Sequence, residues 1–237
     1  MSDNFIGKDV FHQHHKEWWD ENGVFSVLHN LNRVRIPYIM EKIRQVGFNP
    51  EQISLLDVGC GGGIVSCKLS QMGVLNITAI DSLVENIEIA KNYSEKNNIN
   101  VNFVHKSVED LISSEIRYDI VICLEVIEHV EDYHSFLNNL SKLVKKDGLL
   151  IISTISKNIW SYFSMIICAE FLLQIVPKGT HSWSKFINSE DLVNHLVDFD
   201  LINISGIKYN PFFKKFSISS KICDNYIASF AKKIIKI

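Results

Sequence analysis

The sequence predicts an α/β fold in which helices cover both faces of a mostly parallel sheet. Apolar runs of strand length alternate with segments of helix length from residue 53 to about residue 155. A cluster of four glycines follows the first apolar run, and an acidic residue ends the second. Such alternation favours parallel strands, because a parallel pair needs a long crossover connection that a helix usually supplies.

The expected elements follow in chain order. Residues 1–50 are expected to form a helical cap on the sheet. Two late strands, joined by a turn at Asn210-Pro211, are expected to form an antiparallel hairpin at the sheet edge. Strands are expected at 53–58, 76–80, 101–105, 118–124, 148–154, 201–209 and 215–220, and helices at 63–72, 83–97, 132–145 and 189–198.

The composition is that of a folded protein with one large domain. The chain has 237 residues, of which 46% are hydrophobic and 22% charged, and its net charge is −3. This charge gives no general attraction to nucleic acid. The five cysteines form no C-x-x-C pair, which suits a reducing cytosol. Neither a secretory apolar core nor an arginine-rich transit pattern is present near Met1, which favours a cytoplasmic protein, with the mitochondrial matrix as the alternative for a eukaryotic source.

The glycine cluster predicts a binding loop. The first expected strand runs into Asp57, and four glycines then fall within positions 59–63. Because glycine lacks a Cβ, Gly59 and Gly61 allow a tight turn and a close approach to a ligand, next to the free N–H groups of a helix start. Dinucleotide spacing would need a third glycine where Ile64 stands, and no P-loop lysine follows. The loop resembles instead the first motif of class I S-adenosylmethionine (SAM) methyltransferases, in which the preceding acid supports the loop.

Two further strand ends carry polar residues for the same pocket. Asp81 ends the second strand about 20 residues past the glycines, where an acid can bind the ribose hydroxyls of SAM. After the third strand, Val108 is a candidate to pack on adenine, and Glu109 or Asp110 to accept a hydrogen bond from its amino group. The same segment is equally typical of a helix start, because Ser107 and Asp110 form a capping box. The two interpretations are compatible.

A cluster of two carboxylates and an imidazole follows the fourth strand. Glu125, Glu128 and His129 stand at the carboxyl end of a central strand, where active-site crevices lie in such folds. Glu125 and Glu128 are spaced to share one side of a helical turn. The set could bind a divalent cation such as Mg²⁺, with His129 among its ligands. Without a metal, His129 is the candidate general base, and Glu128 is the second catalytic candidate. The alternative is that Glu128 and His129 only orient the loop.

Outside these motifs the chain resembles the ubiquinone-biosynthesis O-methyltransferases of bacteria and mitochondria. The resemblance runs from about Trp18 to about Tyr226. The blocks that carry it are Trp18-Trp19-Asp20-Glu21-Asn22-Gly23-Val24-Phe25, Leu28-His29-x-x-Asn32-x-x-Arg35, Val176-Pro177-Lys178-Gly179-Thr180-His181, Lys185-Phe186-Ile187 and Tyr209-Asn210-Pro211.

The resemblance implies a fold and an activity. The fold is a single Rossmann-like class I methyltransferase domain over residues 1–237, with a seven-stranded sheet and an insertion on the substrate or membrane side at about 155–187. The activity is transfer of methyl from SAM to phenolic hydroxyls of polyprenylated ubiquinone precursors, namely demethylubiquinol and polyprenyl catechol. A complex of ubiquinone-biosynthesis proteins is a further expected partner.

The resemblance also implies roles for single residues. Arg35 matches the SAM-binding arginine, whose guanidinium can pair with the methionine carboxylate. Leu124 falls, with Gly59 and Asp81, on the remaining cofactor positions. Glu125, Glu128 and His129 match the divalent-metal cluster, commonly taken as magnesium. One departure is Ser182, where an aspartate is expected after His181, which makes His181 a weaker site candidate.

Two segments suggest contact with a membrane. The run 159–176 approaches the length of a membrane span, but Glu170 and Gln174 argue against spanning. It is expected to cover the pocket for the polyprenyl tail or to lie in the membrane interface, and the alternative is a core helix of a lid. The C-terminal lysines favour an anionic membrane surface, although such tails are more often only solvated. These lysines are Lys214, Lys215, Lys221, Lys232, Lys233 and Lys236.

Other functions stay open at this point. A methyltransferase acting on another small molecule or on tRNA is one alternative, although a tRNA enzyme should carry a basic stripe that the core of this sequence lacks. A membrane-associated scaffold that binds SAM without catalysis is another. It predicts that loss of Glu125 or Glu128 would be harmless.

Overall fold

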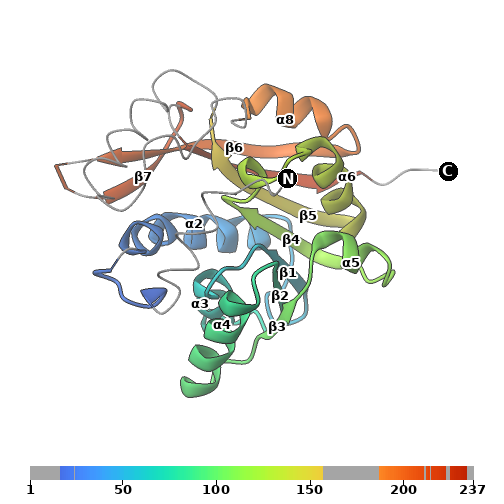
Figure 1. Ribbon diagram of the computed structural model, residues 1–237. Helices are drawn as coiled ribbons and strands as arrows, with labels where there is room; N and C mark the ends of the chain where they lie inside the picture. The colour runs from blue at the N-terminus through green and yellow to red at the C-terminus, as the bar shows by residue number, and fades with distance from the viewer. Residues whose placement is uncertain are drawn as a thin grey trace, which may run out of the picture.

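The computed structural model describes residues 17–23, 25–156, 187–210, 212–213, 215–222 and 225–233. Its centre is an eight-stranded sheet in the order β3-β2-β1-β4-β5-β8-β6-β7 (Figure 1). The strands are β1 (Ser54–Val58), β2 (Asn76–Asp81), β3 (Asn102–His105), β4 (Tyr118–Leu124), β5 (Val144–Ile155), β6 (Phe199–Asn210), β7 (Lys215–Ser219) and β8 (Asn225–Lys232).

The first five strands are parallel and the last three are antiparallel to their neighbours. β1 pairs in parallel with both β2 and β4, so the strand order reverses direction between them. β8 pairs antiparallel with β5 on one side and with β6 on the other. In open sheets of this kind a ligand binds at the carboxyl ends of the strands where the order reverses. The topology therefore directs attention to the ends of β1, β2 and β4.

Helices cover both faces of the sheet (Figure 1). One apolar cluster joins α2 and part of α3 to the sheet, and another joins α5, α6 and α8 to the opposite face. β4 is buried along nearly its whole length, as expected for a strand covered on both sides. The helices are α2 (Ser26–Gln45), α3 (Ile64–Gln71), α4 (Val84–Lys96), α5 (Val108–Ile112), α6 (Tyr133–Leu143) and α8 (Ser189–His195), with a 3₁₀ turn η2 (Ile127–His129).

The capping residues explain where two of these helices begin. The Ser107 hydroxyl accepts the N–H of Asp110 at 3.2 Å, and the Asp110 carboxylate accepts the N–H of Ser107 at 2.9 Å. This reciprocal pair is the capping box predicted for α5. At α6 the Asp132 carboxylate accepts the N–H of Ser135 at 3.1 Å, which satisfies one of the free donors of the first turn.

The predicted α/β architecture is confirmed, with two corrections. β5 begins at Val144, within the last residues of the helix expected at 132–145. β8 was not predicted, so the sheet has eight strands and the expected hairpin of β6 and β7 joins the parallel strands through β8 rather than directly. Its residues from Tyr226 to Phe230 are all fully or almost fully buried. The short apolar run Tyr226-Ile227-Ala228 was the sequence signal for this strand.

Several expectations fall outside the described residues. The segment 159–176 is among them, as are His181 and Ser182. Within the residues that the structure describes, no helix has the length and apolar character needed to cross a membrane.

Candidate active site at the carboxyl edge of the sheet

The glycine loop connects the end of β1 to α3 through a backbone that favours glycine. Gly59, Gly61 and Gly63 have φ angles of 70°, 52° and 81°, in the left-handed region that residues with a Cβ rarely adopt. The N–H of Gly59 donates to the carbonyl of Ile80 at 2.8 Å, which ties the loop to β2. A Cβ on Gly59 would lie 2.4 Å from a methyl group of Val126. The loop is therefore in direct contact with the segment that follows β4.

Two tryptophans of the N-terminal segment lie on this loop. Cβ atoms added at Gly61 and Gly62 would lie 2.5 Å and 2.4 Å from atoms of the Trp18 ring system. The Trp18 indole donates to the Asn86 side chain at 3.1 Å, and the Trp19 indole donates to the carbonyl of Gly62 at 3.0 Å. The glycines of the loop thus serve close packing with the Trp-Trp motif in addition to the turn.

Asp57 lies under the loop and is buried. Its carboxylate accepts a hydrogen bond of 2.5 Å from the hydroxyl of Ser66 on α3. Burial raises the pKa of Asp57 to about 6, against the lowering influence of Ser66 and of Arg35. The acid therefore fixes the start of α3 relative to β1, which agrees with the supporting role expected for it.

Asp81 fastens two loops together. One carboxylate oxygen accepts the N–H of Gly61 at 2.9 Å, and the other accepts the N–H of Leu83 at 2.9 Å and the Asn86 amide at 3.2 Å. The oxygen that faces Gly61 has one partner and can accept a second hydrogen bond. Asp81 thus lies beside the glycine loop as the ribose role requires, and that role stays a prediction.

The adenine-side residues are brought near the edge by the start of α5. Val108 is buried in the cluster formed with α6. Glu109 is exposed, and its carboxylate accepts a hydrogen bond from the Asn139 amide of α6 at 3.3 Å. The carboxylate of Asp110 serves the capping box. Of the two acids proposed for adenine, Glu109 is thus the one whose carboxylate is not part of the helix cap.

Arg35 reaches the edge from α2 and is almost fully buried. Its guanidinium lies 3.5 Å from a carboxylate oxygen of Glu125 and donates to the Ser153 hydroxyl at 3.3 Å. Two more of its nitrogens donate to Asn32, one helical turn earlier, at 3.0 and 2.6 Å. Burial lowers the pKa of Arg35, while the carboxylates of Glu125, Asp57 and Glu128 act in the opposite direction. Asn32 therefore orients a cation that faces several acids.

Glu125 begins the segment after β4 in an unusual backbone conformation. Its φ is 56°, which is uncommon for a residue with a side chain. Its N–H donates to the carbonyl of Ser153 at 2.9 Å. One carboxylate oxygen accepts the Ser153 hydroxyl at 2.9 Å and the other accepts the Asn225 amide at 3.1 Å. The surrounding contacts hold Glu125 in this conformation beside Arg35.

Glu128 is buried next to Glu125 and is held differently. Its carboxylate accepts the Thr154 hydroxyl at 2.9 Å. Burial, and then the neighbouring Glu125, raise the pKa of Glu128 well above its usual range. Successive strand residues point to opposite faces of a sheet. Ser153 therefore donates to Glu125 on one face of β5, and Thr154 donates to Glu128 on the other. The two acids do not share one helical turn as expected, since η2 begins only at Ile127.

His129 and Leu124 complete the predicted set. Leu124 is largely buried in the cluster that includes α2. His129 is exposed, whereas Glu128 beside it in the chain is buried. In the described part of the chain, no three His, Cys, Asp or Glu side chains form a group able to hold a metal ion. The divalent-metal site at Glu125, Glu128 and His129 stays a prediction from the resemblance.

Sequence reasoning missed three residues of the cluster. Ser153 and Thr154 bind the two glutamates, and Asn225 binds Glu125 from the start of β8. A signal was present for the first two, because polar residues at the carboxyl end of an apolar strand mark a site in this type of fold. Asn225 could not be found without β8.

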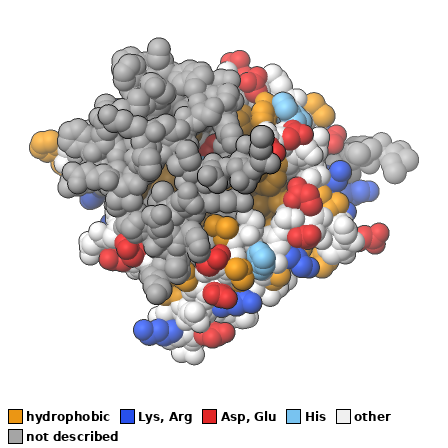
Figure 2. Space-filling model, viewed as in Figure 1, with side chains coloured by type: hydrophobic (Ala, Val, Ile, Leu, Met, Phe, Trp, Pro, Cys, Tyr) orange, Lys and Arg blue, Asp and Glu red, His pale blue; other side chains and the backbone are white. Residues whose placement is uncertain are grey.

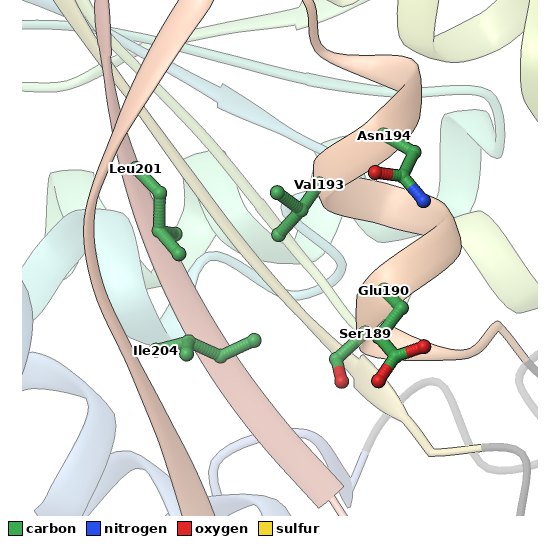
Figure 3. Close-up of a pocket in the computed structure, with 6 residues that line it drawn as sticks. All are labelled: Ser189, Glu190, Val193, Asn194, Leu201 and Ile204. Atoms are coloured by element: carbon green, nitrogen blue, oxygen red, sulfur yellow. The ribbon is translucent and has the colours of Figure 1, made fainter.

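A cavity of about 380 Å³ lies apart from this edge, between α8 and β6. Figure 3 shows Val193 and Ile204 pointing into the space between the helix and the strand. None of the predicted site residues lines this cavity. Its lining residues are Ser189, Glu190, Val193, Asn194, Leu201 and Ile204.

Comparison with known proteins identifies the family. A model described as a methyltransferase domain matches residues 31–205. Ubiquinone biosynthesis O-methyltransferase of Rickettsia typhi is 40% identical over 219 residues, covering 92% of this chain and 88% of the relative. The protein of the same name from Pelagibacter ubique is 35% identical over 225 residues, covering 92% and 93%.

Solved structures agree on the fold. Magnesium protoporphyrin IX methyltransferase of Synechocystis with bound SAM matches with a TM-score of 0.64 at 18% identity, covering 98% of each chain. An N-methyltransferase of Bradyrhizobium japonicum in complex with S-adenosyl-L-homocysteine matches with a TM-score of 0.59 at 15% identity, covering 97% and 99%. These likenesses confirm the class I methyltransferase fold. The sequence relatives establish that this chain belongs to the ubiquinone biosynthesis O-methyltransferase family.

Proposed function

We propose that this protein methylates a phenolic hydroxyl of polyprenylated ubiquinone precursors, with SAM as the methyl donor. The observation that carries the proposal is the set of buried Arg35, partly buried Glu125 and buried Glu128 beside the glycine loop, in a chain 40% identical over 92% of its length to a protein named for this reaction. Demethylubiquinol and polyprenyl catechol are the proposed acceptors.

The cofactor half of the site follows from the first two strand ends. The loop at Gly59 and Gly61 presents backbone to a ligand, and Asp81 beside it has remaining capacity to accept a ribose hydroxyl. Arg35 would pair with the methionine carboxylate of SAM. When bound, SAM supplies an already activated methyl group, so the task of these residues is to orient it.

The charge of the buried cluster suits such a ligand. Asp57, Glu125 and Glu128 all act on the single guanidinium of Arg35. When Asp57 and Glu125 are ionised, their two negative charges exceed the single positive charge of Arg35. A ligand that carries a sulfonium and an ammonium group would offset the excess, because charges interact strongly in a site of low dielectric constant.

The acceptor must lose a proton. A phenol has a pKa of about 10, so a base is needed near neutral pH. A carboxylate whose pKa is raised above its usual range is a better proton acceptor than an ordinary one, and burial raises the pKa of Glu128 in this way. We assign the phenolic proton to Glu128, which Thr154 orients. His129 stays the alternative base, and magnesium stays a prediction from the resemblance.

The setting of the reaction is part of the proposal. A polyprenylated acceptor is held in lipid, so we place the enzyme on the cytoplasmic side of an anionic membrane as a peripheral protein. Association with other ubiquinone-biosynthesis proteins is proposed for the same reason, because it would pass an insoluble intermediate between active sites.

The test is the product mass after incubation with SAM and a short-chain prenylated catechol, with and without a divalent chelator. A product heavier by one methyl group supports the proposal, and its survival on chelation supports a base that acts without a metal, which is Glu128 or, as the alternative, His129. Loss of the product on chelation would support the metal prediction. Absence of any product, with SAM binding measured in the same sample, would contradict the proposal and favour the scaffold alternative.

A further inference from the structure

The turn between β6 and β7 exposes two adjacent phenylalanines. Phe212 is 87% exposed and Phe213 is 65% exposed. The Asn210 side chain accepts the N–H of Phe212 at 3.0 Å and of Phe213 at 3.2 Å. The turn that presents the two rings is thus held by hydrogen bonds. Large apolar side chains gathered at an exposed tip mark contact sites more often than isolated ones do.

The charged residues in the sequence of the hairpin are all of one sign. The sequence from residue 201 to residue 223 contains four lysines and neither aspartate nor glutamate. Lys208 on β6 and Lys215 on β7 are exposed on either side of the turn, and Lys221 is exposed after β7. An aromatic tip flanked by cations complements a surface that is anionic outside and apolar inside, which is the profile of a bilayer with acidic lipids.

The hairpin leaves the sheet at the active edge. β6 remains paired with β8 as far as Ile207, opposite Asn225, and the residues from Lys208 to Asn210 pair with β7 alone. At about 3.4 Å per strand residue, this extension carries the turn on the order of 10 Å beyond the sheet. Asn225, where the extension begins, donates to Glu125 at 3.1 Å. In Figure 1 the hairpin projects to the left, where Figure 2 shows a hydrophobic group at the rim of the molecule.

We propose that the β6–β7 turn inserts Phe212 and Phe213 into the interface of an anionic membrane, with Lys208 and Lys215 at the headgroup phosphates. This inference rests on the proposed function, because a polyprenylated acceptor is delivered from lipid. Anchoring at this turn places the carboxyl edge, and with it Glu125, against the membrane surface. The tail of the acceptor can then stay in lipid while its ring reaches the site.

The test is flotation of the full-length protein with vesicles of phosphatidylcholine and phosphatidylglycerol. The double variant Phe212→Ser/Phe213→Ser is expected to lower the partition coefficient about tenfold or more, because two large apolar side chains lose their burial in lipid. The matched control is Val197→Ser, which removes a side chain that is 68% exposed at the opposite end of β6. It is expected to change binding less than twofold.

A second arm examines the lysines. Lys208→Gln/Lys215→Gln should weaken binding to phosphatidylglycerol vesicles and reduce its dependence on salt, with little effect on the weak binding to pure phosphatidylcholine. Equal flotation of wild type and the phenylalanine variant would overturn the proposal, as would an equal loss for Val197→Ser. Wild-type protein that ignores vesicles but forms dimers dissolved by the phenylalanine substitutions would assign the turn to a second copy instead.

Methyl transfer to a water-soluble catechol, measured without vesicles, separates this proposal from the proposed function. The phenylalanine variant should keep wild-type turnover in that assay, because its substitutions lie outside the site. Normal turnover with normal flotation would overturn only the membrane assignment. Lack of turnover in wild type and variant alike would contradict the proposed function whatever the flotation result.

Discussion

The two acidic positions at the carboxyl edge, at the ends of β2 and β4, are built in opposite ways. Asp81 accepts three N–H donors, from the glycine loop, from Leu83 and from the Asn86 amide on the following helix α4. Glu128 accepts one hydroxyl from Thr154 and faces the second acid, Glu125. Arg35, whose guanidinium lies 3.5 Å from Glu125, comes from α2. This helix packs on the face of the sheet opposite to α6. One acid is compensated locally and the other only by the tertiary fold.

The difference teaches where the chemistry lies. A carboxylate that is satisfied by fixed N–H groups is a rigid binding element, which suits the orientation of a cofactor. A buried carboxylate with few donors and an acidic neighbour has a raised pKa, which suits proton transfer. We therefore expect the β1–β2 end to govern cofactor affinity and the β4–β5 end to govern turnover.

The largest effect on stability is expected at Arg35. The substitution Arg35→Met leaves the partly buried Glu125 without its ion-pair partner, and removal of one partner of a buried pair typically costs about 3–5 kcal/mol. Arg33→Met is the matched control, because Arg33, also on α2, forms an exposed ion pair with Glu21. Its substitution should cost less than about 1 kcal/mol. Urea unfolding measures the free energy of unfolding of both variants. Equal losses would contradict the claim that Arg35 compensates the charge of Glu125 in the folded protein.

The next effect is a dependence of stability on pH at Asp57. Burial raises its pKa from 3.8 to about 6 in the folded protein. The folded state then binds more protons than the unfolded state between these values, so the contribution of Asp57 to stability falls as the pH rises from about 4 to about 6. The shift corresponds to about 3 kcal/mol. Unfolding curves of wild type and Asp57→Asn should diverge over this range, and parallel curves would contradict the burial of an ionisable Asp57.

The smallest effect is expected where compensation is local. Ser107→Ala removes the side-chain half of the capping box of α5 and should cost about 1 kcal/mol in thermal or urea unfolding. Ser107→Asp is the control, because aspartate is also a favourable N-cap and should retain most of the stability. A loss as large as that of Arg35→Met would remove the distinction between local and tertiary compensation.

The same distinction decides what the sequence could predict. The glycine loop, Asp81 and the capping box of α5 depend on turn geometry and neighbours within a few residues, and all were placed correctly in the fold. Ser153 and Asn225 act on Glu125 through strand pairing across 28 and 100 residues of sequence, and that pairing required β8. Whether Glu128 and His129 are buried or exposed depends on how η2 packs on the sheet. The spacing of these residues in the sequence does not determine that packing.

The division of the edge is tested most directly by two variants assayed side by side, Glu128→Gln and Asp81→Asn. SAM affinity is measured by calorimetry, and turnover on a short-chain prenylated catechol is measured at saturating SAM. We predict that Glu128→Gln lowers turnover about 100-fold or more, as loss of a general base does, while SAM affinity changes less than about threefold because the Thr154 hydrogen bond can persist. Asp81→Asn should weaken SAM binding about tenfold and spare turnover. Wild-type turnover in Glu128→Gln, or wild-type SAM affinity in Asp81→Asn, would contradict the account.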